Sequence, residues 1–318
     1  MRKLLGAAAF GCGIVFCAWA ATDILPVSGA LRTTTMQRLL LVDAERFANR
    51  IVAVGDRGYV VISDDYGASW RRAKAPAAPL LTAVDFLDDQ LAIAVGHDSV
   101  ILSSSDGGEN WTQRFSAPDD GRPLLDVVFV KKDFAVAVGA YGAYYESADS
   151  GATWTARKII ADDKHLNVIV ELGEGNLLIL GETGTILTSG DWGKTWAPVP
   201  SPYKGSFFGA LVTDDRAVVA FGMRGRIYRS TDKGKSWKQV DNPSTATLIG
   251  GEKLPDGALV LAGSAGTALL SRDHGQSFVP IKTGTTQGFA KPVFGAENTV
   301  LLLGEAGARQ VAIPVAAK

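Results

Sequence analysis

The segment Ser63-Asp64-Asp65-Tyr66-Gly67-Ala68-Ser69-Trp70 is the first of six similar segments in this 318-residue chain. The later copies run from Ser104 to Trp111, Ser147 to Trp154, Ser189 to Trp196, Ser230 to Trp237 and Ser271 to Phe278. Their third-position aspartates are Asp65, Asp106, Asp149, Asp191, Asp232 and Asp273, which lie 41, 43, 42, 41 and 41 residues apart. A period of about 40–50 residues is typical of propeller blades, so the sequence predicts a repeat fold.

Each residue type in this segment suits a tight reversal between two antiparallel strands. The Asp side chain accepts hydrogen bonds from backbone N–H groups two or three residues on, and the Gly supplies a positive φ angle. The final aromatic residue begins the next strand, where an indole buries roughly 150–250 Å². We therefore interpret five tryptophans as structural residues rather than a ligand platform: Trp70, Trp111, Trp154, Trp196 and Trp237.

A second element, Gly-x-x-Gly, follows an apolar run in every repeat. It occurs at Gly55–Gly58, Gly139–Gly142, Gly181–Gly184, Gly222–Gly225, Gly263–Gly266 and Gly304–Gly307, and the copy at Gly96 ends in Ser99. This element has seven copies and the aspartate segment has six, so the last repeat is truncated. The run before it, such as Ile51 to Val54, is apolar on both faces, which indicates a strand buried on both sides.

These repeats predict an all-β fold, a seven-bladed β-propeller of four-stranded antiparallel blades with a pitch of about 41 residues. Seven units of that length use nearly all of residues 21–318, which we interpret as a single propeller domain. The truncated last blade lacks an outer strand. We expect residues 24–31, around Ile24 to Leu31, to supply it.

The N-terminus has the features of a secretory signal peptide. Arg2 and Lys3 precede an apolar stretch, and Ala18-Trp19-Ala20 is a small-x-small cleavage signal. Residues 1–20 are therefore expected to be removed, together with both cysteines, Cys12 and Cys17. This predicts export to the periplasm or an equivalent compartment. The alternative is a retained N-terminal membrane anchor, for which the apolar stretch is a little short.

Charge and motif content narrow the class of function. The chain has 32 Lys and Arg against 33 Asp and Glu, a net charge of −1, which does not favour binding to nucleic acid or to a membrane surface. No Cys or His spacing suits zinc, and no GxSxG elbow is present. The Gly-x-x-Gly turns are not followed by a helix that would hold a dinucleotide phosphate. We expect no catalytic residues, no cofactor and no metal.

Carboxylates on the predicted axial strands keep hydrolase activity as an alternative function. These strands are approximately residues 38–44, 80–86, 124–130, 166–172, 207–213, 247–252 and 287–294, and Arg38 is their only arginine. A sialidase needs an arginine cluster at the axis, besides a Tyr nucleophile and an acid/base carboxylate. Asp85, Asp126 and Glu171 either form an opposed pair for hydrolysis or are tunnel-wall residues, and we favour the second interpretation.

The aspartate segment matches the Asp-box, or BNR, repeat. Its pairing with Gly-x-x-Gly over nearly the whole mature chain resembles the photosystem II stability/assembly factor family. The resemblance implies an exported propeller that acts without catalysis, as an assembly chaperone or scaffold. Photosynthetic members are associated with early photosystem II assembly and use an arginine-rich patch, and relatives elsewhere are sometimes associated with membrane exporters. The implied partner is a protein of a membrane complex, a photosystem component or an exporter, bound by a monomer.

The candidate contact residues are placed on the side of the ring that carries the Gly-x-x-Gly turns, because propellers usually bind there. They are Arg57, His97, Tyr141, Tyr203, Arg224 and Arg226. The arginine patch carries over only in part, at Arg57, Arg224 and Arg226, since the equivalent turn positions elsewhere are not basic. The alternative function is a sialidase-like or other carbohydrate-binding or carbohydrate-hydrolysing Asp-box propeller.

Overall fold

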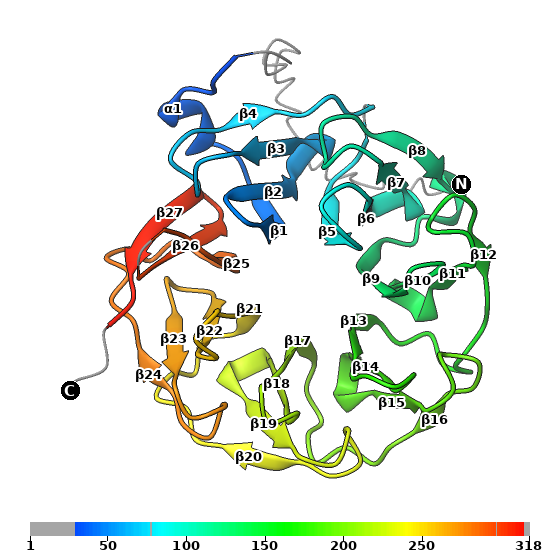
Figure 1. Ribbon diagram of the computed structural model, residues 1–318. Helices are drawn as coiled ribbons and strands as arrows, with labels where there is room; N and C mark the ends of the chain where they lie inside the picture. Colours follow the sequence, from blue (N-terminus) through cyan, green and yellow to red (C-terminus); the bar gives the residue numbers. More distant parts are fainter. Residues whose placement is uncertain (1–28, 77, 297, 315–318) are drawn as a thin grey trace, which may run out of the picture.

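The computed structural model describes residues 29–76, 78–296 and 298–314. Seven small sheets stand around a central axis like blades, in sequence order around the ring (Figure 1). The predicted signal peptide, residues 1–20, lies outside the described residues. In the described part of the chain, no helix has the length and apolar character needed to cross a membrane.

Each blade begins at the axis and proceeds outward. The innermost strands are β1 (Leu41–Phe47), β5 (Leu81–Phe86), β9 (Leu124–Lys131), β13 (Leu166–Glu171), β17 (Phe207–Val212), β21 (Leu248–Lys253) and β25 (Phe289–Phe294). The second strands are β2 (Arg50–Gly55), β6 (Ala92–Gly96), β10 (Phe134–Gly139), β14 (Leu177–Gly181), β18 (Val218–Gly222), β22 (Leu259–Gly263) and β26 (Thr299–Gly304).

The outer strands are shorter. The third strands are β3 (Val60–Ser63), β7 (Ile101–Ser104), β11 (Tyr144–Ser147), β15 (Ile186–Ser189), β19 (Ile227–Ser230), β23 (Ala268–Ser271) and β27 (Gly307–Ala312). The fourth strands are β4 (Arg71–Arg72), β8 (Thr112–Phe115), β12 (Thr155–Ala156), β16 (Ala197–Pro198), β20 (Lys238–Val240) and β24 (Val279–Pro280). The one α-helix among the described residues, α1 (Thr33–Met36), precedes blade 1.

Neighbouring strands in every sheet pair antiparallel and in chain order. Six blades have four strands and blade 7 has three among the described residues. The predicted fold class, a seven-bladed β-propeller of antiparallel blades, is confirmed.

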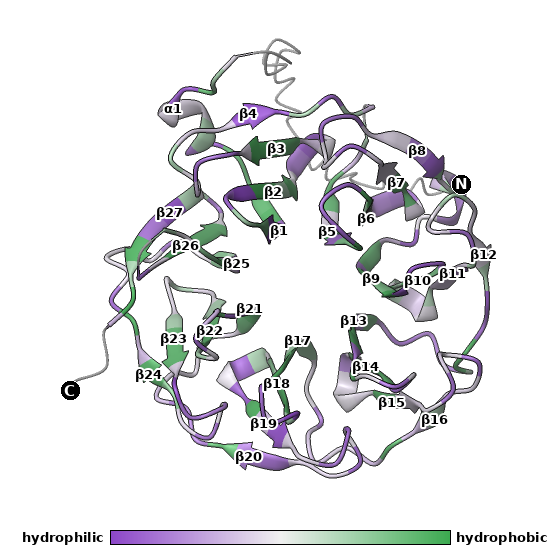
Figure 2. Cartoon of the chain, viewed as in Figure 1, coloured by the Kyte–Doolittle hydropathy of each residue, from purple (hydrophilic) through white to green (hydrophobic). Residues whose placement is uncertain are grey.

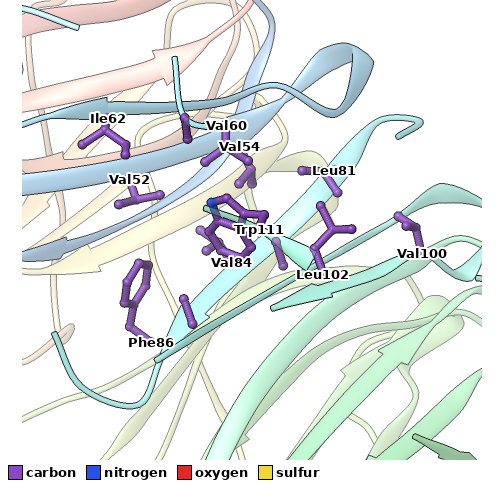
Figure 3. Packing of buried hydrophobic residues seen from close by; sticks show 13 residues of the cluster. Val52, Val54, Val60, Ile62, Leu81, Val84, Phe86, Val100, Leu102 and Trp111 are labelled. Carbon is purple, nitrogen blue, oxygen red and sulfur yellow. The ribbon is translucent and has the colours of Figure 1, made fainter. Parts of the chain in front are cut away.

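The core consists of layers between adjacent blades. The second strands are buried along nearly their whole length, as the doubly apolar runs predict, and Figure 2 shows β2 and β3 as apolar while β4 and β20 are hydrophilic. Figure 3 shows the layer between blades 1 and 2, where the indole of Trp111 lies among Val54, Val84 and Leu102. Trp111 is 6% exposed.

The Asp-box turns are closed by their own side chains. In the first box the Ser69 N–H donates to Asp65 Oδ1 (2.8 Å) and the Ser69 hydroxyl donates to Oδ2 (2.6 Å). Ser63 donates to Asp65 and accepts from the Gly67 N–H, and Gly67 has φ +88°. The Ser69 N–H lies four residues after the Asp, and in the sixth box the Gln276 N–H, three residues after Asp273 and within the expected range, also donates to Asp273 Oδ1 (3.0 Å). The same bonds recur in all six boxes.

The Gly-x-x-Gly turns hold the second strand tightly against the incoming chain. A Cβ on Gly96 would lie 2.2 Å from the carbonyl oxygen of Leu80, so only glycine fits. The Ser99 that replaces the last glycine of this turn adopts φ +50°, and its hydroxyl donates to the Arg122 carbonyl (2.8 Å). That bond ties the turn to the crossing into blade 3.

The ring closes differently from the expectation. Ala30 pairs with Arg71 and the Leu31 N–H donates to the Trp70 carbonyl (2.6 Å), so this part of residues 24–31 lies against β4 of blade 1, not against blade 7. Residues 24–28 lie outside the described residues. Blade 7 is joined instead through the segment after α1, because the Gly307 N–H donates to the Leu39 carbonyl (2.8 Å).

The packing between blades 7 and 1 explains this closure. Met36 and Leu39 are buried with Leu303 and Val293 of blade 7 and Leu41 of blade 1. The N-terminal segment therefore acts as the crossing into blade 1. One residue assignment changes with it: Arg38 is exposed before β1, and the arginine within β1 is Arg46.

Candidate partner-binding site

The propeller has two faces with different turns. On one, which we call the glycine face, the Gly-x-x-Gly turns contact the crossings between blades, as where the Gly142 N–H donates to the Lys164 carbonyl (2.8 Å). On the other, the box face, the Asp-boxes contact the turns between first and second strands, as where the Tyr66 N–H donates to the Asn49 carbonyl (3.1 Å). This is the arrangement that the sequence predicts.

Three of the six candidate residues gather on the glycine face of blade 5. The crossing from blade 4 brings Tyr203 over the turn, where its hydroxyl donates to the Met223 carbonyl (2.8 Å). Its ring lies 5.5 Å from that of Tyr228 and 5.3 Å from that of Phe207. Burial raises the pKa of Tyr203, and the nearby positive charges of Arg224 and Arg226 lower it. We call Tyr203, Arg224, Arg226 and Tyr228 the blade 5 cluster.

The two arginines of this cluster are available to a partner. Arg224 and Arg226 are exposed, and neither has a carboxylate of the described residues within ion-pair distance. Arg224 has φ +58° within the turn. Met223 beside it is 38% exposed, and Tyr203 is half-buried over the buried ring of Tyr228. The cluster thus places two cations, which have no carboxylate partner among the described residues, beside an aromatic ring.

Tyr141 lies two blades away on the same face. It is 54% exposed and its ring packs edge-on against His165 at 4.9 Å. It borders a cavity of about 230 Å³ that is also lined by Arg122, Arg157 and Lys158. Sequence reasoning missed these three basic residues. Lys158 is exposed, whereas Arg122 pairs with Asp120 (2.6 Å) and Arg157 with Glu146 (3.5 Å).

The remaining two candidates lie elsewhere on the glycine face. Arg57 forms an ion pair with its neighbour Asp56 (3.4 Å) at the turn of blade 1. His97 is exposed at the turn of blade 2. The structure therefore groups Tyr203, Arg224 and Arg226 and leaves Arg57 and His97 apart from them.

Four arginines of the box face are held by carboxylates. Arg50 binds Asp64 (2.6 Å), Arg272 binds Asp256 (2.9 Å) and Arg229 binds Asp215. Arg71 binds Glu109 of the next blade (2.5 Å). Besides these pairs, every third-position box aspartate accepts bonds within its own turn. Arg216 and Lys235, by contrast, are exposed on this face and have no ion pair among the described residues.

The axial carboxylates tie adjacent blades together. Asp43 accepts the N–H of Val84 (2.9 Å), and Asp85 accepts that of Phe129 (2.6 Å). Asp126 likewise accepts the N–H of Ile169 (2.8 Å). Glu171, by contrast, accepts the Gly173 N–H within its own hairpin (2.7 Å). These bonds favour the tunnel-wall interpretation of Asp85, Asp126 and Glu171 over a hydrolytic pair.

Sequence reasoning missed the charged neighbours of these carboxylates. Lys291 of β25 binds Asp43 (3.2 Å). Although burial opposes it, the negative charges of Asp43, Glu45 and Glu252 hold the pKa of Lys291 above its ordinary value. Burial raises the pKa of Glu252 to about 8 and that of Asp126 to about 7. No set of three His, Cys, Asp or Glu side chains in the described ranges is arranged to hold a metal ion.

Comparisons with known proteins agree with the fold and the repeats. A family model described as photosynthesis system II assembly factor YCF48 matches residues 116–261, from the crossing after blade 2 into β22. A solved structure described as YCF48 bound to D1 peptide is 19% identical, with a TM-score of 0.70, over 88% of this chain and 95% of the other. YCF48 from Cyanidioschyzon merolae is 18% identical, with a TM-score of 0.69, over 88% and 97%.

The resemblance to photosystem II assembly factors is therefore confirmed. A glycoside hydrolase of family GH74 from Niastella koreensis is also similar in structure, at 16% identity and a TM-score of 0.66, over 89% of this chain and 44% of the hydrolase. At such identities the structural likeness shows the fold alone. A search of curated protein sequences finds no match.

Proposed function

We propose that this protein is an exported, non-enzymatic propeller that binds a protein partner through its glycine face and assists assembly of a membrane complex. The observation that carries the proposal is the blade 5 cluster, in which Arg224 and Arg226 lie beside Tyr203 and have no carboxylate partner in the described part of the chain. The family match to an assembly factor and the D1 peptide bound by a similar propeller support it.

The composition of this cluster suits protein recognition. Tyr and Arg are enriched at protein interfaces and dominate their binding energy, because a large rigid surface and a planar cation bind at low entropic cost. Two free guanidinium groups favour a carboxylate-bearing segment, with which they form charge-assisted hydrogen bonds. An extramembrane segment of a photosystem component or of an exporter fits this chemistry.

Export follows from the N-terminal sequence pattern, in which Arg2 and Lys3 precede an apolar stretch and Ala18-Trp19-Ala20. In that compartment a monomeric propeller meets the exported segments of membrane proteins. The carbohydrate-hydrolysing alternative has less support, because Asp85 and Asp126 already accept backbone N–H groups across blades. We therefore propose binding without catalysis.

Affinity capture from solubilised membranes tests the proposal. The test variant is the double substitution Arg224→Ala and Arg226→Ala. The matched control is Arg216→Ala with Lys235→Ala, which removes two exposed cations from the box face, where Arg216 has φ +61°, close to the +58° of Arg224. We expect the test variant to lose a membrane complex that the wild type and the control retain. Equal retention by all three, or capture of a soluble glycan alone, would contradict the proposal.

A further inference from the structure

Blade 7 has an open edge unlike that of any other blade. Its outermost strand among the described residues is β27, which has six residues and pairs with β26 alone. The outermost strands of the other six blades have two to four residues. Proteins keep exposed edge strands short because a long one is a template for another strand.

The pairing in the other blades identifies the unused groups of β27. In blade 1 the Val60 carbonyl accepts the N–H of Ala73, and in blade 4 the Ile186 carbonyl accepts that of Val199, both at 2.9 Å. Val60 and Ile186 occupy the same position, opposite the residue that precedes the first glycine of the turn. Ala308, opposite Leu303, holds this position in blade 7, and its carbonyl has no such partner among the described residues. Since alternate residues of a strand point the same way, Gln310 also directs its N–H and C=O outward.

A cavity adjoins this edge. It has a volume of about 310 Å³, with the buried side chains of Phe289 and Leu302 below and Gln37 and Arg309 at its rim. The Arg309 Nε–H donates to the Thr283 carbonyl (3.0 Å), which fixes the guanidinium, and no carboxylate of the described chain pairs with it. Cross-strand neighbours share a face, so a residue paired with Arg309 would lie beside the cavity.

No other described segment of the chain pairs with this edge. Ala30 forms an antiparallel bridge with Arg71 of blade 1. At the other end the Ile313 N–H donates to the Asn298 carbonyl (2.8 Å), and Arg272 donates to the Pro314 carbonyl (2.9 Å).

We propose that β27 is a strand-addition site for an extended segment of the partner protein. The segment pairs antiparallel with Ala308 to Gln310 and carries an apolar residue opposite Ala308 and an acidic residue opposite Arg309. Such addition is a recurrent mode of peptide recognition, in which main-chain bonds supply affinity and alternate side chains supply specificity. The inference rests on the proposed function, to which it adds a second contact at the edge of the ring.

Amide hydrogen exchange of the intact protein, followed by NMR, locates the site. In the protein alone, the Ala308 and Gln310 amides should exchange much faster than those of Arg309 and Val311, which face β26. The probe is a synthetic peptide with the sequence of residues 236–242, which contains β20, carrying Gln239→Glu to place a carboxylate opposite Arg309. It should slow exchange at Ala308 and Gln310. The same peptide with Val240→Pro, which removes the N–H that would donate to the Ala308 carbonyl, should not.

Two variants of Gln310 test the main-chain contact. Gln310→Pro removes the outward N–H and should weaken peptide binding about tenfold, the equivalent of one hydrogen bond at 1.4 kcal/mol. Gln310→Ala keeps the N–H and should bind as the wild type does. Thermal unfolding shows whether each variant is folded. The peptide with Gln239→Glu should bind the wild type about threefold more tightly than the unsubstituted peptide does, and Arg309→Ala should abolish this difference in affinity.

Each contrary outcome is distinct. Slow exchange at Ala308 and Gln310 in the monomer alone means that the chain's own segment covers the edge, and slow exchange only in a concentrated dimer means a second copy does. Either result overturns the inference, as does a peptide that binds Gln310→Pro unchanged. In the membrane-capture experiment, the Gln310→Pro variant could retain the complex while the Arg224→Ala/Arg226→Ala variant loses it. That result would show that the glycine face is the binding site and would overturn the proposed site at β27. The reverse pattern supports the edge and removes the glycine face.

Discussion

The two faces of this propeller are built from turns that both depend on glycine, yet they differ in what they leave exposed. In an Asp-box, Asp149 accepts from the Thr153 N–H (2.8 Å), the Thr153 hydroxyl (2.6 Å) and the Ser147 hydroxyl (2.8 Å). In the Gly-x-x-Gly turns the reversal is closed mainly by backbone bonds, such as that from the Gly139 N–H to the Ala143 carbonyl (2.9 Å), and side chains such as Tyr141 and Arg224 are exposed. The box aspartates are therefore occupied within their own turns, whereas the turn residues Tyr141 and Arg224 of the glycine face are exposed.

The largest effect is expected where the glycine face contacts its own crossing. A Cβ on Gly222 would lie 2.2 Å from the Ser206 carbonyl oxygen, whereas a Cβ on Gly190, within a box, would meet nothing nearer than 3.9 Å. Gly222→Ala should lower the free energy of unfolding by about 3 kcal/mol, because backbone must shift. Gly190→Ala should change it by less than about 0.5 kcal/mol. Urea denaturation measures both, and similar values would show that the turn yields easily.

A smaller loss is expected from the box face. Asp149→Ala removes three hydrogen bonds that close one turn and should cost about 1–2 kcal/mol, as loss of a helix cap does. The control is Asp119→Ala, an exposed carboxylate in the crossing before blade 3. If the two variants unfold at the same urea concentration, the box bonds do not stabilise the fold.

The box aspartates and the carboxyl groups that line the axial channel have pKa values shifted in opposite directions, so their contributions to stability should respond oppositely to pH. The Thr153 and Thr195 groups hold the pKa values of Asp149 and Asp191 at about 2, below the ordinary 3.8, so this stability is present above pH 4 and lost toward pH 2. Burial raises the pKa values of Asp126 and Glu252 to about 7 and 8, so their contribution is present below pH 4 and lost as the pH rises through 7 to 8.

Urea midpoints measured from pH 2 to pH 9 should therefore be highest near pH 4, and should decline both toward pH 2 and between pH 4 and pH 8. Asp126→Asn should lessen the decline above pH 4 and leave the decline below pH 4 unchanged, because the amide does not ionise. Asp191→Asn should lessen the decline below pH 4 alone. A decline above pH 4 that persists in full in Asp126→Asn would contradict the assignment of the channel carboxylate.

The smallest effect on stability is expected at the proposed contact residues. Arg224→Ala with Arg226→Ala removes no ion pair of the described residues and should shift the free energy of unfolding by less than about 0.5 kcal/mol. Arg229→Ala breaks the pair with Asp215 and the bond to the His274 carbonyl, and should cost about 1 kcal/mol. A larger loss from the glycine-face pair would mean that it is structural.

The features that could be predicted from the sequence are those that depend on interactions between residues close together in the chain. The boxes and Gly-x-x-Gly turns depend on residues within four positions, so the repeat count, the turn glycines and the two faces follow from spacing. The partners of Lys291 and the direction of Leu31 depend on blades that meet only when the ring closes, which no local pattern encodes. The grouping of Tyr203 with Arg224 likewise requires the crossing to fold over the turn. The channel carboxylates offered a signal that was overlooked, the i, i+2 charges Asp43 and Glu45 on one inner strand.

Recognition by the glycine face can be tested directly by mapping amide hydrogen exchange with the bound peptide in place, using the D1 peptide that the similar propeller binds. We predict slower exchange at the Gly-x-x-Gly turns and crossings of blades 3 to 5, including Tyr141 and Arg224, with no change at the six Asp-boxes. Protection confined to the boxes, with the turns of blades 3 to 5 unchanged, would contradict the account.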